Sequence, residues 1–181
     1  MICAFGSESL ALMKVMTAPL LTERLRIEPM TPTVARHAEA GPAALGEALG
    51  VRVPREWWAA NLRLLTSRPR APERAIVIHR EDERVVGDLR FEPLRGALRT
   101  FELGYAIQPD YRRIGIATEA AGAVLDWLFE EADAERVIAG CDRRNKPSVR
   151  TLMKLGFWLD SSRGDAFWWT ISPELRGDAR S

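Results

Sequence analysis

A short basic segment that contains a glycine, residues 112–118, runs directly into an amphipathic helical pattern. From Ala117 onward, apolar residues recur at the three- and four-residue spacing of one helix face. The first N–H groups of a helix have no partner within it and carry partial positive charge, so a phosphate is a natural ligand there. Gly115 lets a ligand approach the backbone, and Arg112 and Arg113 can add charge-assisted hydrogen bonds. Taken alone, the segment fits either an anion site or a loop with two solvated arginines.

The preceding residues, 100–107, alternate large apolar residues with small or polar ones, as a half-buried strand does. A strand, a basic loop and a helix N-terminus in this order predict a pocket for a phosphorylated cofactor at the end of the strand. The loop has neither the Gly-Lys-Ser/Thr triplet of a Walker loop nor the spaced glycines of a dinucleotide fold.

A second segment that can do chemistry begins at Asn145. Asn145 or Lys146 is suited to cap a helix with Pro147 in its first turn, and Ser148 adds a hydroxyl at the same end. Gly156 is suited to end that helix in the left-handed conformation.

Both segments match motifs of a known superfamily. Arg112-x-x-Gly115-x-Ala117 resembles the R/Q-x-x-G-x-G/A signature of the GCN5-related N-acetyltransferases (GNAT), and Asn145-x-x-Ser148 with Gly156-Phe157 follows in the expected order. The surrounding sequence resembles the RimJ/RimL-like branch of ribosomal-protein N-terminal acetyltransferases, down to the opening at residues 22–27. The resemblance extends over about residues 20–171 and is strongest from 102 to 157.

The resemblance implies a GNAT fold and acetyl-CoA as co-substrate, with no metal. It places the pyrophosphate on the amides of the loop and the pantetheine arm on the backbone of the preceding strand. Asn145 matches the asparagine that bonds the cofactor arm, and a plain helix cap is compatible with that role. The cofactor-binding residues expected on this basis are Tyr105, Ala106, Ile107, Arg112, Arg113, Ile114, Gly115, Ile116, Ala117, Thr118 and Asn145.

Acetyl transfer to an amine requires the neutral amine, because an ammonium has no lone pair with which to attack a thioester. Glu102 is the candidate base: it shares a strand face with Gly104 and Ala106, and relatives often carry a glutamate here. The alternatives are a proton-conducting water chain, or a Glu102 that only binds the substrate ammonium.

A hydroxyl donor can stabilise the departing CoA thiolate. Many relatives use a tyrosine seven residues after the motif asparagine, but that position is Leu152 in this sequence. Ser148 is the remaining candidate, and a capping-turn hydroxyl is the alternative reading.

Composition sets the frame for these sites. The chain has 181 residues, 46% of them hydrophobic, and a net charge of +1, which predicts one domain and gives no general attraction to nucleic acid or membranes. The two cysteines and two histidines have neither disulfide nor zinc spacing, which favours a reducing cytoplasm. We expect a flexible extension over residues 1–17, a GNAT domain over 18–173 and a C-terminal tail over 174–181.

The elements that must position the sites follow from periodicity. Strands are predicted near residues 20–29, 74–80, 84–91, 100–107, 136–141, 157–159 and 166–171, with helices between them. This pattern predicts an α/β (α+β) architecture, with a mixed, mostly antiparallel sheet of about seven strands flanked by helices. Trp57 and Trp58 lie on a helix after Pro54, where they either pack onto the sheet or wall the acceptor site. The aromatic residues of the last hairpin either fill the core or form a homodimer contact, and their number favours the contact.

The leading hypothesis is an acetyl-CoA-dependent N-acetyltransferase that acts directly on a primary amine, either a protein N-terminus or a small molecule. The alternative is a non-catalytic acyl-CoA-binding sensor that keeps the cofactor site. A nucleotide-binding loop is a third reading, and the missing lysine after Gly115 argues against it.

Overall fold

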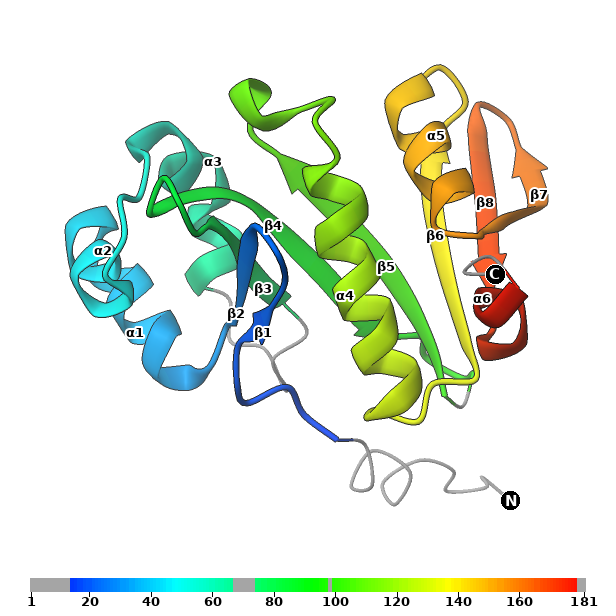
Figure 1. The fold of residues 1–181 in the computed structure, drawn as a ribbon, viewed down its shortest axis with the longest axis horizontal. Coiled ribbons are helices and arrows are strands. Elements are labelled where there is room, and N and C mark those ends of the chain that lie inside the picture. Colours follow the sequence, from blue (N-terminus) through cyan, green and yellow to red (C-terminus); the bar gives the residue numbers. More distant parts are fainter. Residues whose placement is uncertain (1–13, 67–73, 98, 179–181) are drawn as a thin grey trace, which may run out of the picture.

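The computed structural model describes residues 14–66, 74–97 and 99–178. These residues form one eight-stranded sheet in the order β1-β2-β3-β4-β5-β6-β8-β7, with helices on both faces (Figure 1). The β5–β6 pair is parallel and the other neighbouring pairs are antiparallel. The predicted mixed, mostly antiparallel sheet is therefore confirmed, with eight strands in place of about seven.

The strands are β1 (Leu20–Leu21), β2 (Leu25–Pro29), β3 (Arg74–His79), β4 (Arg84–Pro93), β5 (Thr100–Ile107), β6 (Arg136–Asp142), β7 (Trp158–Arg163) and β8 (Ala166–Ile171). The helices are α1 (Pro32–Ala40), α2 (Pro42–Leu49), α3 (Arg55–Thr66), α4 (Ile116–Glu130), α5 (Lys146–Lys154) and α6 (Pro173–Asp178). A single 3-10 turn, η1 (Pro109–Tyr111), links β5 to the loop before α4.

The sheet separates two hydrophobic cores. In β3, Ala75 and Val77 belong to the core shared with α4, whereas Ile76 and Ile78 belong to the core shared with α1, α2 and α3. This division follows from strand geometry, since successive side chains point to opposite faces. Figure 1 shows α4 lying across the near face of the sheet. The two faces are thus covered by different helices and can support different functions.

Strands β5 and β6 pair over only three positions, from Thr100 opposite Arg136 to Glu102 opposite Ile138. Both strands continue beyond that point, to Ile107 and Asp142, and Figure 1 shows them diverging. The edge of β5 that faces β6 therefore carries backbone N–H and C=O groups outside the ladder. Such groups need hydrogen-bond partners, and an extended ligand arm can supply them.

The first and the last of the described residues pack against the rest of the domain. Met16 is 1% exposed, and Arg176 of α6 donates to Asp126 Oδ1 at 2.6 Å and to the Gly122 carbonyl at 2.9 Å. Residues 174–178 of the expected tail thus belong to a helix that contacts α4. The division into residues 1–17, 18–173 and 174–181 stays a prediction.

The last hairpin divides its aromatic residues between the core and the surface. Trp169 of β8 is buried, whereas Trp158 and Leu159 of the edge strand β7 are each 49% exposed. The homodimer contact expected there stays a prediction. Over residues 14–66, 74–97 and 99–178, no helix has the length and apolar character needed to span a membrane.

Candidate active site

The loop before α4 presents its backbone to solvent. Arg113 and Gly115 both have positive φ, at 66° and 88°, and residues 112–115 are exposed. Gly115 is the N-cap of α4, and no side chain caps the helix there. The first N–H groups of a fifteen-residue helix are consequently left for a ligand, and the helix dipole favours an anionic one.

Arg112 attaches the loop to the strand before it. Its Nε donates to the Ile107 carbonyl at 2.7 Å. The guanidinium therefore holds the loop at the end of β5. This arrangement leaves the loop amides, more than the Arg112 side chain, as the groups available to an anion.

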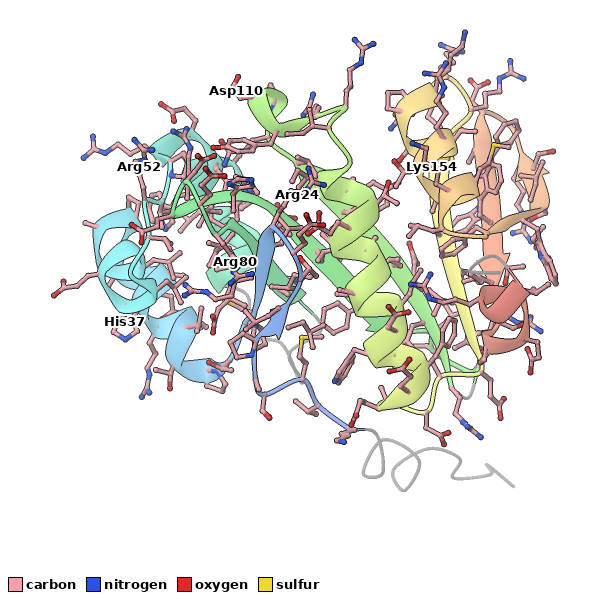
Figure 2. The ribbon with its side chains drawn as sticks, in the orientation of Figure 1. Arg24, His37, Arg52, Arg80, Asp110 and Lys154 are labelled. Atoms are coloured by element: carbon pink, nitrogen blue, oxygen red, sulfur yellow. The ribbon has the colours of Figure 1, made fainter. Side chains whose placement is uncertain are left out.

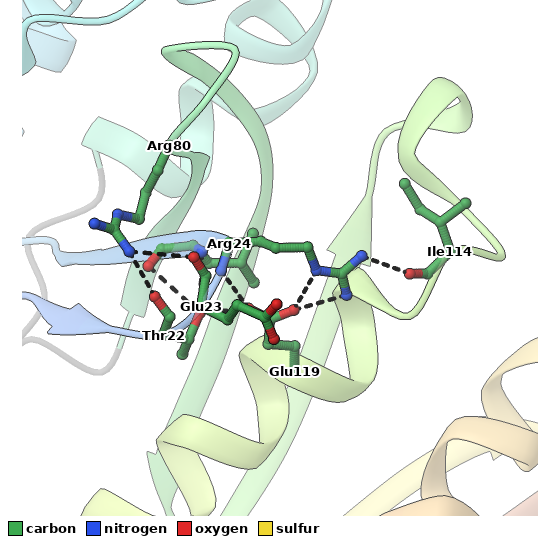
Figure 3. Close-up of polar contacts among 7 residues, drawn as sticks. Thr22, Glu23, Arg24, Arg80, Ile114 and Glu119 are labelled. Carbon is green, nitrogen blue, oxygen red and sulfur yellow. Dashed lines mark hydrogen bonds and ion pairs between the residues drawn. The ribbon is translucent and has the colours of Figure 1, made fainter.

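A carboxylate on the first turn of α4 holds the helix against the N-terminal strands. Glu119 Oε1 accepts from Thr22 Oγ1 at 2.5 Å and from the Arg24 backbone N–H at 2.9 Å, and Oε2 accepts from Arg24 Nε at 2.7 Å (Figure 3). Arg24 Nη1 also donates to the Ile114 carbonyl at 2.9 Å. Figure 2 places Arg24 beside the N-terminal end of α4. The loop is thus fixed from both of its ends.

This environment determines the charge of Glu119. Burial alone would raise the pKa of its carboxyl, but the hydrogen bonds from Thr22 and Arg24 and the Arg24 charge together hold that pKa below its ordinary value. Glu119 and Arg24 were not among the residues predicted from the sequence. The signal for Arg24 was the resemblance of residues 22–27 to a family opening, which carried no physical argument, and no signal singled out Glu119.

A second attachment joins η1 to the turn between β3 and β4. The Tyr111 hydroxyl donates to Asp82 Oδ2 at 2.6 Å, and His79 Nδ1 lies 3.1 Å from the same oxygen. The His79 and Tyr111 rings are 5.5 Å apart. His79 therefore contributes to the structure that supports the loop.

The start of α5 contacts β5 across the gap between β5 and β6. Tyr105 OH lies 3.0 Å from Ser148 Oγ, and Asn145 Oδ1 accepts from the Ser148 N–H at 3.2 Å as the N-cap of α5. Burial raises the pKa of the Tyr105 phenol, although the hydrogen bonds to Ser148 and Thr151 act in the opposite direction. The protonated Tyr105 phenol therefore lies next to the hydroxyl of Ser148, which was predicted as a catalytic residue. Sequence reasoning assigned only the Tyr105 backbone and missed this contact.

A cavity of about 230 Å³ lies between α3 and the sheet face opposite α4. Trp57, 6% exposed, forms part of its wall and donates from Nε1 to Asp88 Oδ2 at 3.2 Å. Trp57 thus both packs in the core and lines the cavity, while the Trp58 Nε1 donates to the Ala38 carbonyl at 2.9 Å. The residues that line the cavity are Met30, Trp57, Asn61, Arg74, Ala75, Ile76, Asp88, Leu89, Arg90, Gly104, Tyr105 and Ala106.

Asp88 is the carboxylate of this cavity, and the sequence analysis did not single it out. It lies on β4 directly opposite Ala106 of β5. Burial raises the pKa of its carboxyl, while the hydrogen bond from Trp57 and the charges of Arg90 and Arg74 act in the opposite direction. A carboxylate with an elevated pKa in a cavity is a candidate functional group.

Glu102 lies on the same sheet face but outside the cavity lining. It is the last β5 residue paired with β6, and it is opposite Glu92 of β4. Four residues along a strand separate it from Ala106, which corresponds to about 13 Å. Its carboxylate takes part in no hydrogen bond or ion pair within the described part of the chain. Glu102 is thus available where the two strands begin to diverge.

The predicted residues therefore fall into two groups. Residues 112–118 come together at the end of β5, next to the segment of Tyr105, Ala106 and Ile107 that lies beyond the β5–β6 ladder, with Asn145 and Ser148 across the gap. Glu102 is at the opposite end of the diverging segment.

Burial raises the pKa of the Cys141 thiol, which argues against a thiolate nucleophile. No metal-binding group of three or more His, Cys, Asp or Glu occurs among residues 14–66, 74–97 and 99–178.

Known proteins share both the sequence and the fold. The chain is 37% identical over 84 residues to the uncharacterized N-acetyltransferase YnaD of Bacillus subtilis, covering 46% of this chain and 49% of that protein. It is 29% identical over 96 residues to the uncharacterized N-acetyltransferase YjdG of the same organism, covering 52% and 56% respectively. The chain thus spans about half the length of the curated relatives it matches.

Solved structures resemble this chain over most of its length. An acetyltransferase (GNAT family) from Bacillus anthracis has a TM-score of 0.63 at 23% identity, covering 86% of this chain and 99% of that one. The ribosomal-protein-S5-alanine acetyltransferase from Vibrio fischeri has a TM-score of 0.60 at 16% identity, covering 86% and 96%. At these identities the likeness shows the fold. The family model described as "Acetyltransferase (GNAT) domain" matches residues 24–158, well over half of the sequence, and the chain therefore belongs to the GNAT acetyltransferase family.

Proposed function

We propose that this protein is an acetyl-CoA-dependent N-acetyltransferase that transfers the acetyl group directly to a primary amine. The observation that carries the proposal is the uncapped, exposed N-terminus of α4, entered through Gly115 at the end of β5. Membership of the GNAT family supports acetyl-CoA as the occupant of that site.

In this proposal the cofactor lies along the gap between β5 and β6. The amides of Arg113 to Thr118 bind the pyrophosphate, with Arg112 holding the loop through the Ile107 carbonyl. The backbone of Tyr105, Ala106 and Ile107 bonds the pantetheine arm, because this edge lies beyond the β5–β6 ladder. Asn145 completes the site from the start of α5.

The reaction follows from the available groups. The lone pair of a neutral amine attacks the thioester carbonyl, and Glu102 accepts the amine proton, through water where it is not in direct contact. The tetrahedral intermediate then collapses by breaking the carbon–sulfur bond. The departing CoA thiolate accepts a hydrogen bond from the Ser148 hydroxyl, which lies 3.0 Å from Tyr105 OH. Glu102 releases the amine proton to solvent, and solvent protonates the thiolate.

The acceptor belongs to one of two classes, a protein N-terminus or a small-molecule amine. The RimJ/RimL resemblance and the fold shared with a ribosomal-protein acetyltransferase favour the first class. The small cavity of about 230 Å³ beside Asp88 favours the second. A non-catalytic acyl-CoA sensor would keep the cofactor site and lack turnover with both classes.

A thiol-release assay with acetyl-CoA over peptides and small amines tests the proposal. We expect CoA release with at least one amine, and we expect Glu102→Gln to lower kcat by about 100-fold or more while acetyl-CoA affinity stays unchanged. Glu81→Gln, in the exposed β3–β4 turn, is the matched control.

Unchanged turnover in Glu102→Gln would remove Glu102 as the base and leave a water chain or another carboxylate. Wild-type protein that binds acetyl-CoA but acetylates no amine would establish the sensor instead.

A further inference from the structure

The cavity beside α3 is lined by one carboxylate and two guanidinium groups. Asp88 and Arg90 lie two residues apart on the same face of β4, and Arg74 lies directly opposite Arg90 on β3. Residues two apart on a strand are separated by about 6.6 Å. The cavity therefore offers a negative group and a positive pair at a fixed spacing.

Arg90 is positioned over β5 by the absence of a side chain at Gly104. A Cβ built on Gly104 would lie 3.3 Å from Arg90 Nη2 and 3.6 Å from Arg90 Nε. The Arg90 side chain is 48% exposed, so its guanidinium is accessible from the cavity. Gly104 thus provides the space in which the guanidinium lies against the strand.

The two arginines of this cavity share one carboxylate, that of Glu92, and their charges also act on Asp88. Both Arg74 and Arg90 approach the same oxygen, Glu92 Oε1, at 3.8 Å, near the outer limit for an ion pair. Like charges placed directly opposite each other on adjacent strands are unfavourable. An anionic group that reaches the half-exposed Arg90 guanidinium would form charge-assisted hydrogen bonds there, beside Arg74.

Asp88 has one oxygen available to a cation. Its Oδ2 accepts from Trp57 Nε1, and within the described residues its Oδ1 has no hydrogen-bond partner. Asp88 also lies opposite Ala106, on the strand expected to carry the pantetheine arm. An amine held by Asp88 would therefore lie near the cofactor.

We propose that the acceptor is an amino-acid-like molecule, with its amine at Asp88 and its carboxylate at Arg90 and Arg74. This inference rests on the proposed N-acetyltransferase function and specifies its substrate class. The volume agrees with a small acceptor: at about 30 Å³ per water molecule, 230 Å³ corresponds to roughly eight waters. That is less than the range of about 300–1,000 Å³ typical of sites for drug-sized ligands. Polyamines, which carry only cationic groups, would meet two guanidiniums.

The test compares matched acceptors in the thiol-release assay. Each L-amino acid is paired with its carboxamide and with the amine that lacks the carboxyl group. We expect wild-type kcat/KM to be about 10- to 100-fold higher for the best acids than for their amides, as one charge-assisted contact implies. Arg90→Gln should reduce this ratio to near one, and Arg90→Lys, which keeps the charge, should retain part of it. Arg95→Gln, in the exposed turn after β4, is the control and should leave the ratio unchanged.

The outcomes separate this inference from the function on which it rests. Acetylation of amides or simple amines as fast as acids, or an Arg90→Gln variant with an unchanged ratio, overturns the inference while the enzyme activity stands. No turnover with any amine, despite acetyl-CoA binding, overturns the proposed function. Calorimetry with the same acids and amides then decides the inference by binding: tighter binding of the acids supports it, and equal or absent binding overturns it.

Discussion

Two partly buried carboxylates on opposite faces of the sheet have pKa values shifted in opposite directions. Glu119, at the cofactor loop, receives hydrogen bonds from Thr22 and from two groups of Arg24, and its pKa is lowered despite its burial. Asp88, in the cavity beside α3, receives one hydrogen bond from Trp57, and its burial raises its pKa. The protein supplies three hydrogen bonds to the first carboxylate and one to the second, for which we propose a ligand.

The same contrast holds for the arginines. Arg24 lies 2.7 Å from Glu119, whereas Arg74 and Arg90 each lie 3.8 Å from Glu92. The loop proposed to bind the cofactor is thus held in place before any ligand binds, which lowers the cost of binding. In the cavity proposed for the acceptor, the contacts of Arg74 and Arg90 to Glu92 are longer, and a ligand of complementary charge would add to them.

The strongest way to break the comparison is to remove Glu119. Glu119→Ala should lower the free energy of unfolding by about 2 to 3 kcal/mol, because it leaves the Arg24 and Thr22 donors without their acceptor. It should also weaken acetyl-CoA binding about tenfold, since the Arg24 contact to the Ile114 carbonyl then loses its support. Urea unfolding and a binding titration measure the two effects. Glu130→Ala, at the other end of α4, is the control, and equal losses in both variants would contradict the assigned role.

Alanine substitutions at two glycines test the same contrast, and we expect stability losses of intermediate size. A Cβ on Gly87 would lie 2.3 Å from the Ala106 carbonyl oxygen, so Gly87→Ala must displace backbone and should cost about 1 to 2 kcal/mol of stability. A Cβ on Gly104 meets only the flexible Arg90 guanidinium, so Gly104→Ala should cost less than about 1 kcal/mol. Gly104→Ala should instead reduce the preference for acceptors that carry a carboxylate. Thermal unfolding and the matched acceptor assay check the pair, and a reversed order of stability would contradict it.

Asp88→Asn should give the smallest change in stability. A carboxyl with a raised pKa in the folded protein stabilises it at low pH, and that contribution is lost as pH rises through the folded pKa. At pH 7 the Asn variant should therefore be as stable as wild type or more stable, and the difference should disappear below pH 3.8, the ordinary value. Melting temperature as a function of pH measures this effect. A variant that is less stable at pH 7 would show that Asp88 is a structural partner.

The kinetics of the same variant separate the two carboxylates of the acceptor face. Asp88→Asn should raise KM for amino acids about tenfold, as loss of one charged hydrogen bond implies, with a smaller change in kcat. A fall in kcat of about 100-fold at constant KM would instead assign the base to Asp88.

The parts that sequence could predict are those fixed by local physics. The left-handed Gly156, the amphipathic α4, the Asn145 cap and the alternation of β5 all depend on neighbours within a few residues. The sequence analysis predicted one strand over residues 20–29 and did not separate the two-residue β1 from β2, because so short an element has no period to detect.

The parts that sequence could not predict depend on contacts between distant segments. Glu119 meets the backbone of Arg24 across 95 positions, and Asp88 meets Trp57 across 31. In the sequence, Asp88 appears only as a polar residue after Gly87 on a strand. Its burial follows from the packing of α3 on the sheet, which periodicity along one strand does not reveal.

Direct transfer of the acetyl group is the central claim, and single-turnover mass spectrometry tests it most directly. Wild-type protein is mixed with acetyl-CoA and the L-amino acids, then quenched at intervals. The account predicts that CoA and an N-acetylated amino acid appear together in equal amounts, while the protein stays unmodified. Acetylated protein that forms before the product, or acetyl-CoA that is bound but never consumed, would contradict it.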